Sequence, residues 1–118
     1  MSTTSLQPLP SQEFFETLLV RPSNIEAPLP QKATPLVIIY FTARWCGACK
    51  RLDIPTLMGI RPDAQWYKCD IDENEYTPGY CGVTTIPAFQ AISYGKPIGL
   101  LSNSQTTRVA EWLASLPH

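Results

Sequence analysis

The sequence lacks an excess of either charge and has almost no histidine. Nine Lys and Arg residues against ten Asp and Glu residues give a formal net charge of −1, which disfavours a general binder of nucleic acids or anionic membranes. The only histidine is His118. Four cysteines in 118 residues are too few to indicate a secreted scaffold held together by disulfides. The length and the apolar content of 44% are those of one globular domain.

Long apolar segments and targeting signals are also missing. The longest apolar run, residues 36–41, is far too short to cross a bilayer. Residues 1–10 have neither the basic region nor the apolar core of a signal peptide. Glu13 and Glu16 precede the first basic residue, Arg21, which is atypical of a mitochondrial presequence. We therefore expect a reducing intracellular compartment, the cytoplasm.

The periodicity and the prolines divide the chain into an N-terminal arm with one helix, residues 1–35, and a domain, residues 36–118. Helical spacing of apolar residues over 11–20, with Ser11 as N-cap, predicts the first helix, and the proline-rich stretch 21–35 predicts an extended connector. The pattern then predicts strand 36–42, a helix to about residue 60 kinked at Pro55, strand 65–71, a short helix 74–81, a hairpin of strands 88–93 and 98–101, and a last helix 105–116. This order of strands and helices indicates an α/β sandwich.

Two cysteines two residues apart follow directly on the apolar strand 36–42, in the run WCGACK at 45–50. Cys46 stands where a helix is expected to begin, and the unpaired N–H groups and the positive end of the helix dipole there favour a thiolate. Cys49 lies on the same side of the first turn and can form a disulfide with it. We expect Cys46 to be the more exposed and more acidic thiol. Such a pair indicates a thiol–disulfide oxidoreductase.

The same spacing of cysteines also occurs in structural zinc sites. Zinc would require two more ligands, yet the only histidine is His118, and Cys69 and Cys81 do not form a second C-x-x-C pair. The preceding strand favours the redox interpretation, in which no metal is bound.

Residues 43–50 (ARWCGACK) resemble the active-site loop of thioredoxins, in which proline usually stands where this chain has Ala48. Residues 67–74 (YKCDIDEN) are similar to the strand and turn after the active-site helix, and residues 82–89 (GVTTIPAF) to the segment with the cis-proline. The resemblance extends over about residues 36–116. It implies a thioredoxin-like fold, in which a central mixed β-sheet flanked by helices forms a single α/β domain.

The resemblance also implies the roles of individual residues. It makes Cys46 the attacking nucleophile and Cys49 the resolving thiol, so that their disulfide takes the place of any cofactor. It implies that Pro87 is cis beside the disulfide, which leaves the backbone of Ile86 free to pair with a substrate strand. Without the resemblance, Pro87 would only be expected to start a strand. Trp45 is expected to cover the cysteines and contribute to the substrate surface.

We expect the residues between the two cysteines to tune the disulfide, and the other two cysteines to be structural. Gly47 and Ala48 lie between the cysteines and tune the stability of the disulfide, and the absence of the usual proline leads us to expect a less reducing couple than in a typical thioredoxin. Cys69 is expected to pack as a small apolar group. Cys81 is expected to be inert and partly buried, with a third reactive thiol as the alternative.

Tyr40 and Lys68 depart from the thioredoxin pattern as a pair. Thioredoxins typically carry a buried aspartate that serves the resolving cysteine and pairs with a lysine on the neighbouring strand. Lys68 stands at the lysine position, but Tyr40 stands at that of the aspartate. Tyrosine has a reference pKa of ~10 and is a poor base near neutral pH. We expect Tyr40 to be a core aromatic, Cys49 to be deprotonated slowly, and Lys68 to be buried without its partner.

The leading functional hypothesis is a protein-disulfide oxidoreductase that acts on disulfide-containing protein substrates and is recharged by a thioredoxin-reductase-like electron donor. The alternative is a thioredoxin-fold binding or adaptor module with incidental redox activity, which the missing aspartate and the N-terminal arm favour. The intact C-x-x-C pair opposes it, because an adaptor has no need of both thiols. We expect a monomer that binds neither nucleic acid nor membranes.

Overall fold

The computed structural model describes residues 6–19 and 36–117, so the predicted connector 21–35 lies outside the described residues. In these two ranges lie, in order, β1 (Leu6–Pro8), α1 (Gln12–Thr17), β2 (Leu36–Thr42), the 3₁₀ turn η1 (Cys49–Arg51), α2 (Ile54–Ile60), β3 (Gln65–Asp70), α3 (Tyr76–Cys81), β4 (Ala88–Ser93), β5 (Lys96–Ser102) and α4 (Thr106–Ser115). No helix among them is long and apolar enough to cross a membrane.

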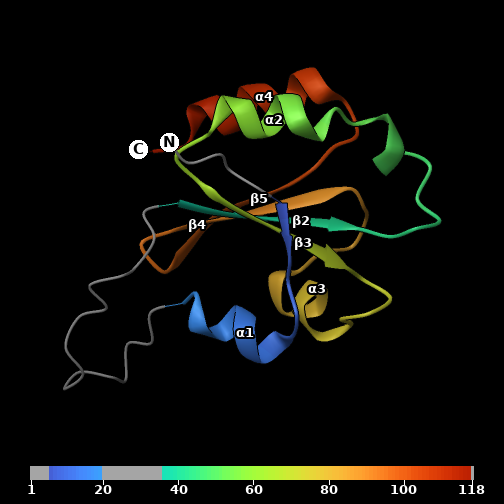
Figure 1. The fold of residues 1–118 in the computed structure, drawn as a ribbon, viewed down its shortest axis with the longest axis vertical. Helices are drawn as coiled ribbons and strands as arrows, with labels where there is room; N and C mark the ends of the chain where they lie inside the picture. Colours follow the sequence, from blue (N-terminus) through green and yellow to red (C-terminus); the bar gives the residue numbers. More distant parts are fainter. Residues whose placement is uncertain (1–5, 20–35, 118) are drawn as a thin grey trace.

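The strands form one mixed sheet in the order β1-β3-β2-β4-β5. The strands β1 and β2 run parallel to β3 on either side of it, whereas β4 is antiparallel to both β2 and β5. Helices α2 and α4 cover one face of the sheet, and α1 and α3 cover the other (Figure 1). This architecture confirms the predicted α/β domain with a central mixed sheet flanked by helices.

The central strand β2 separates two hydrophobic clusters, because its alternate side chains point to opposite faces. All seven of its residues are buried, as expected for a strand covered on both faces. Ile38 and Tyr40 belong to the cluster under α2 and α4, together with Leu113. Ile39 and Phe41 belong to the cluster on the side of α1 and α3. Each redox or structural cysteine therefore faces one of two separate cores.

The predicted hairpin is present, and its turn explains its geometry. Tyr94 and Gly95 have φ angles of 50° and 82°, the left-handed values that a two-residue hairpin turn requires at both central positions. The strand after the turn begins at Lys96, two residues earlier than predicted, and includes Pro97. Proline is tolerated there because β5 is an edge strand and the ladder is irregular beside it.

The N-terminal half contains one element that we did not predict and contradicts one prediction. The arm forms a strand, β1, which the sequence analysis did not predict and which adds to the sheet beside β3. The helix after the cysteines is not continuous to residue 60, because η1 ends at Arg51 and α2 begins anew at Ile54. Asp53 caps α2 by accepting the N–H of Thr56 at 3.2 Å, and Pro55 lies in its first turn instead of kinking a longer helix.

A buried arginine joins the end of α2 to the end of α4. The Arg61 side chain is only 3% exposed and forms a bidentate pair with Asp63, at 3.0 and 2.9 Å. Its guanidinium also donates to the carbonyl oxygens of Leu113, Leu116 and Pro117 at 2.9 to 3.0 Å. It thereby satisfies carbonyl groups that a helix leaves unpaired at its C-terminus.

Candidate active site

The two cysteines of the C-x-x-C pair lie at the carboxyl end of β2 and are joined by a disulfide. Their Cα atoms are 5.3 Å apart, within the normal range for a disulfide. A tight turn after β2, in which the N–H of Cys46 donates to the carbonyl of Ala43 at 3.1 Å, directs the chain back over the sheet. Both cysteines belong to the cluster under α2 and α4.

The backbone distinguishes Cys46 from Cys49, although exposure does not. Both are 4% exposed, so the expectation that Cys46 is the more exposed residue was wrong for this disulfide form. The N–H of Cys49 instead donates to Sγ of Cys46 at 3.0 Å. A hydrogen bond to sulfur stabilises its negative charge, so this contact favours a thiolate at Cys46 once the disulfide is reduced. We predicted that the dipole of a long helix would stabilise the Cys46 thiolate. Because η1 is a single turn, we assign this stabilisation to the N–H of Cys49 instead.

Trp45 is 65% exposed beside the disulfide, and its indole N–H donates to the carboxylate of Asp72 at 2.8 Å. The sequence analysis placed Trp45 on the substrate surface but missed Asp72. Asp72 follows β3, whose parallel pairing with β2 brings the loops after both strands to the same edge of the sheet. An acidic loop after the neighbouring strand was the available signal.

The Ile86–Pro87 peptide bond is cis, as predicted. Pro87 is buried, and Ile86 is half-buried against the cluster that contains both cysteines. Ser102 at the end of β5 donates to the carbonyl of Thr85 at 3.4 Å, which ties this loop to the sheet. The fold therefore brings residues 46, 49, 86 and 87 to one site, although some 40 residues separate the cysteines from the proline along the chain.

Tyr40 lies directly under the disulfide, as a core aromatic. It is 5% exposed and stacks on Phe89, with ring centroids 5.1 Å apart. Its hydroxyl donates to the backbone carbonyl of Cys49 at 3.5 Å. Burial raises the pKa of Tyr40, and a hydrogen bond with Thr42 only partly opposes this rise. Tyr40 therefore stays protonated near neutral pH and supports the backbone of Cys49.

Lys68 pairs with Tyr40 across the β2–β3 ladder, but its side chain is exposed. The prediction of a buried ammonium without a partner was therefore wrong, because Lys68 lines a surface pocket together with Pro8 and Thr42. Gly47 has no close neighbour at the position of an added Cβ atom, so nothing in its packing demands glycine. Ala48 packs against the cluster under α2 and α4.

The two remaining cysteines lie on the other face of the sheet. Cys69 on β3 is fully buried, and Cys81 at the end of α3 packs against the same cluster, on the side of α1. Burial, with smaller contributions from Cys81 and Asp70, raises the pKa of the Cys69 thiol to about 12. Burial likewise raises the pKa of the Cys81 thiol to about 12. Both thiols therefore stay protonated near neutral pH, as expected for inert cysteines.

Comparison with known proteins agrees with this geometry. A family model for thioredoxin matches residues 16–115. The chain is similar to mitochondrial thioredoxin-3 of Saccharomyces cerevisiae, with 31% identity over 87 residues that cover 72% of this chain and 68% of the relative. It is also similar to thioredoxin of Gallus gallus, with 28% identity over 96 residues that cover 80% and 91% of the two chains.

Comparison with solved structures also finds thioredoxins. The crystal structure of oxidised mitochondrial thioredoxin 3 from Saccharomyces cerevisiae matches with a TM-score of 0.76 and 26% identity, covering 94% of this chain and 95% of that one. The family match includes both cysteines of the disulfide and the cis-proline. The disulfide is accordingly that of a protein thiol–disulfide oxidoreductase, and the chain belongs to the thioredoxin family.

Proposed function

We propose that this chain reduces disulfides of protein substrates, with Cys46 as the attacking thiolate and Cys49 as the resolving thiol. The observation that carries this assignment is the hydrogen bond from the N–H of Cys49 to Sγ of Cys46, which favours negative charge on one sulfur of the pair. Pro87 and Ile86 lie in the adjacent loop, where an extended segment of the substrate can approach the sulfur atoms.

The proposed reaction consists of two thiol–disulfide exchanges. The thiolate of Cys46 attacks one sulfur of the substrate disulfide, and the other substrate sulfur leaves as a thiolate. Cys49 then loses its proton and attacks Sγ of Cys46, which releases the second substrate thiolate and leaves the Cys46–Cys49 disulfide. Two electrons pass to the substrate. The cysteines themselves carry the electrons, and a thioredoxin-reductase-like donor restores the dithiol.

We propose further that the resolving step is slow, because Tyr40 stands where a carboxylate would accept the proton of Cys49. The Tyr40 hydroxyl donates to the carbonyl of Cys49 and has a raised pKa, so it is not a base near neutral pH. The thiol of Cys49 then gives its proton to water or to another group. This slow step is consistent with a reductase of low turnover or with an exchange of disulfides.

A trapping experiment tests the two cysteine roles. The Cys49→Ser variant should accumulate mixed disulfides with substrate proteins on non-reducing gels, because Cys46 attacks and nothing releases it. The matched Cys46→Ser variant should trap none. Equal trapping by both variants, or stoichiometric zinc in the purified wild type, would contradict the assignment. Absence of turnover by the wild type in an insulin reduction assay would instead favour the adaptor function.

The cytoplasm remains the proposed location. It follows the expectation from the sequence, although the relative from Saccharomyces cerevisiae is named mitochondrial. Imaging of the chain with a fluorescent protein fused to its C-terminus in its own cells would test the proposal, and fluorescence confined to mitochondria would contradict it.

A further inference from the structure

The outer edge of β5 is left open over its apolar half. β5 is the last strand of the sheet, and no strand in the described ranges pairs with its outer side. Lys96 and Pro97 protect only its beginning, as charges and prolines commonly do on edge strands. From Ile98 to Ser102 the strand carries neither a charge nor a proline. Its free N–H and C=O groups there can accept another strand.

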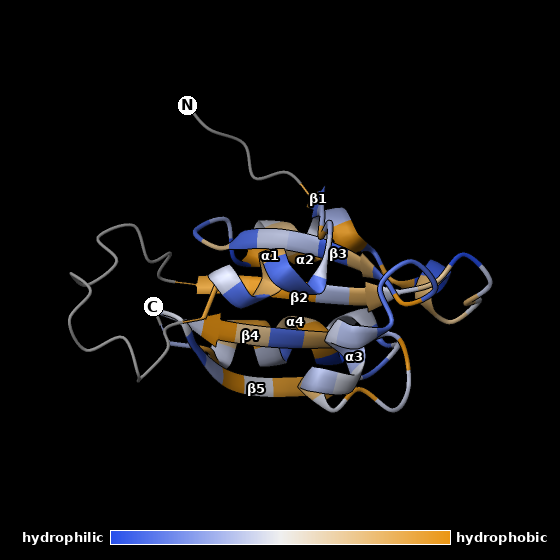
Figure 2. Ribbon diagram, turned by 90° about the horizontal axis from the view of Figure 1, so that it is seen from below, coloured by the Kyte–Doolittle hydropathy of each residue, from blue (hydrophilic) through white to orange (hydrophobic). Residues whose placement is uncertain are grey.

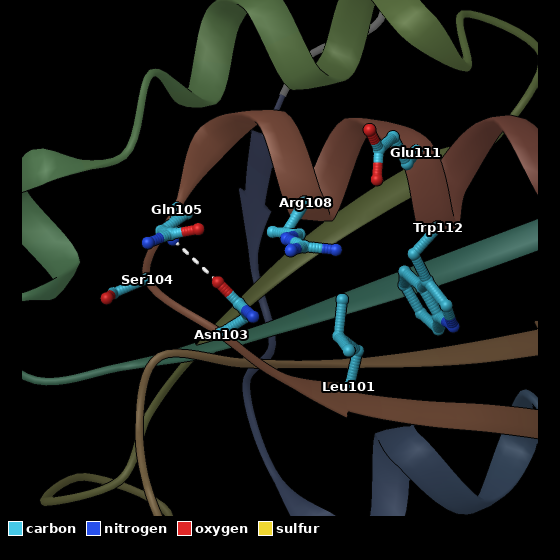
Figure 3. A pocket seen from close by; sticks show the side chains of 7 residues that line it. All are labelled: Leu101, Asn103, Ser104, Gln105, Arg108, Glu111 and Trp112. Carbon is cyan, nitrogen blue, oxygen red and sulfur yellow. Dashed lines mark hydrogen bonds between the residues drawn. The ribbon is translucent and has the colours of Figure 1, made fainter.

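Apolar side chains flank this open edge on both faces of the sheet. Ile98 and Leu100 are 40% and 38% exposed. Leu100 faces the side of α1 and α3, because it pairs with Gln90, which pairs in turn with Ile39 of the cluster on that side. Figure 2 shows the hydrophobic middle of β5 at the margin of the sheet. On the opposite face, Leu101 and Trp112 line a shallow pocket of about 870 Å³ between β5 and α4 (Figure 3). The edge thus combines unpaired backbone groups with apolar side chains on both faces, such as an interior strand of a larger sheet has.

Arg108 and Glu111 carry opposite charges beside this edge, so the patch is complementary to the same patch on a second copy of the chain. Arg108 and Glu111 line the pocket from neighbouring turns of α4, and neither forms an ion pair with any described residue. The ring of Trp112 lies over Gly99, so α4 runs antiparallel to β5 with Arg108 toward Ser102. A two-fold axis near Leu100 would therefore bring each Arg108 toward Glu111 of the other copy. Two-fold contacts require such self-complementary patches.

We propose that two copies of this chain associate through antiparallel pairing of their β5 strands, centred on Leu100. The pairing joins the two sheets into one, buries Ile98 and Leu100 at the junction, and places Leu101 beside Gly99 of the other copy and the Trp112 ring that covers it. The disulfide lies at the end of β2, two strands inward from β5, and stays accessible. This proposal departs from the monomer that we expected from the sequence.

Sedimentation velocity of the wild type over micromolar to millimolar concentrations tests the proposal. The mass should rise from 13.2 kDa toward twice that value. Leu100→Lys should remain monomeric throughout, because it puts a charge at the centre of the edge. Gln7→Lys is the matched control, since Gln7 is exposed on β1 at the opposite edge of the sheet, and this variant should associate like the wild type. Far-UV circular dichroism and insulin reduction verify that each variant is folded.

A charge exchange distinguishes the two-fold arrangement from nonspecific association. Arg108→Glu alone and Glu111→Arg alone should each weaken association roughly tenfold, because like charges then face each other. The double variant, and an equimolar mixture of the two single variants, should associate like the wild type. A wild type that stays monomeric at all concentrations would overturn the proposal and leave the edge to a strand of a different protein. Association that Leu100→Lys does not affect, or single variants that do not complement each other, would overturn it as well.

Discussion

The four cysteines form two groups on opposite faces of the sheet, and the groups differ in bonding state and in the groups that face their sulfur atoms. Cys46 and Cys49 lie in a turn at the end of β2, on the side of α2 and α4, and are joined by a disulfide. Cys69 and Cys81 lie on the side of α1 and α3 as free thiols, each with a pKa raised to about 12. The difference arises from surroundings, since the side chains are the same.

The comparison shows that burial alone does not decide which cysteine is reactive. Cys46 and Cys49 are as deeply buried as typical core residues, at 4% exposure each. What distinguishes Cys46 is a backbone N–H directed at its sulfur, whereas the SH group of Cys69 donates to the carbonyl of Asn74 at 3.9 Å. An N–H group stabilises a thiolate, and a carbonyl oxygen stabilises the neutral thiol.

The largest expected effect is on turnover. Cys46→Ala should reduce insulin reduction to the background rate, because the attacking sulfur is removed. Cys81→Ala should stay within about twofold of the wild type, as for substitutions outside a functional site. Both variants are measured at equal concentration, and circular dichroism verifies the fold. A loss of activity in Cys81→Ala as large as that in Cys46→Ala would contradict the difference between the two groups of cysteines.

The second expected effect is on alkylation of the reduced protein. Near neutral pH, Cys46 should react rapidly with iodoacetamide, whereas Cys69 and Cys81 should react on the order of 10³-fold more slowly than an unperturbed thiol with a pKa of ~8.5. Mass spectrometry of peptides after timed quenching measures each site separately. Guanidinium denaturation is the control, since it should make all four cysteines react alike.

The raised pKa values of Cys69 and Cys81 also predict that the folded protein loses stability at alkaline pH. Folding raises the pKa of both thiols, so the folded state binds protons more tightly and the contribution is fully present below the unfolded pKa of ~8.5. It is lost as the pH rises toward about 12. The Cys69→Ala, Cys81→Ala double variant should show a smaller decrease of its urea midpoint between pH 8 and pH 10 than the wild type, and an equal decrease would contradict the raised pKa values.

The smallest expected effect concerns the missing acid beneath the redox pair. Tyr40→Asp should accelerate the resolving step near neutral pH, on the order of 10²-fold if the new carboxylate reaches Cys49, at the lower end of general-base contributions. Decay of a purified mixed disulfide in stopped flow measures this step directly. The variant should also lose about 3–5 kcal/mol of stability, because it removes a ring stacked on Phe89.

Tyr40→Phe is the matched control for that variant. It retains the ring and removes only the hydroxyl that donates to the carbonyl of Cys49, which should cost about 1 kcal/mol of stability. It introduces no base, so the resolving step should not accelerate. Equal acceleration in both variants would show that loosening of the turn, and not a carboxylate, controls the resolving cysteine.

The parts of the site that the sequence could predict are those carried by local patterns. Cys46, Cys49 and Pro87 belong to short motifs, and the apolar run of β2 fixes the strand that precedes the disulfide. Asp72 was missed because its contact with Trp45 spans 27 positions of sequence and depends on parallel pairing of β3 with β2. No periodicity within one segment encodes such a contact.

The errors in our prediction of the fold have similar physical causes. The strand β1 has only three residues and ends on a proline, so it exists only because β3 offers a partner. Lys68 was predicted to be buried, but its exposed side chain lines a pocket together with Pro8 and Thr42. The start of α2 could have been recognised, since Asp53 followed by Pro55 is a common sequence at helix N-termini.

Arg61 links the folding of the middle of this domain to the synthesis of residues 113–117. Its buried guanidinium donates five hydrogen bonds, two to the carboxylate of Asp63 and three to the carbonyl oxygens of Leu113, Leu116 and Pro117. A nascent chain still lacking residues 113–117 can form the Asp63 pair but must leave the other donors unsatisfied or hydrated. The middle of this domain therefore reaches its final packing only after its last helix has left the ribosome.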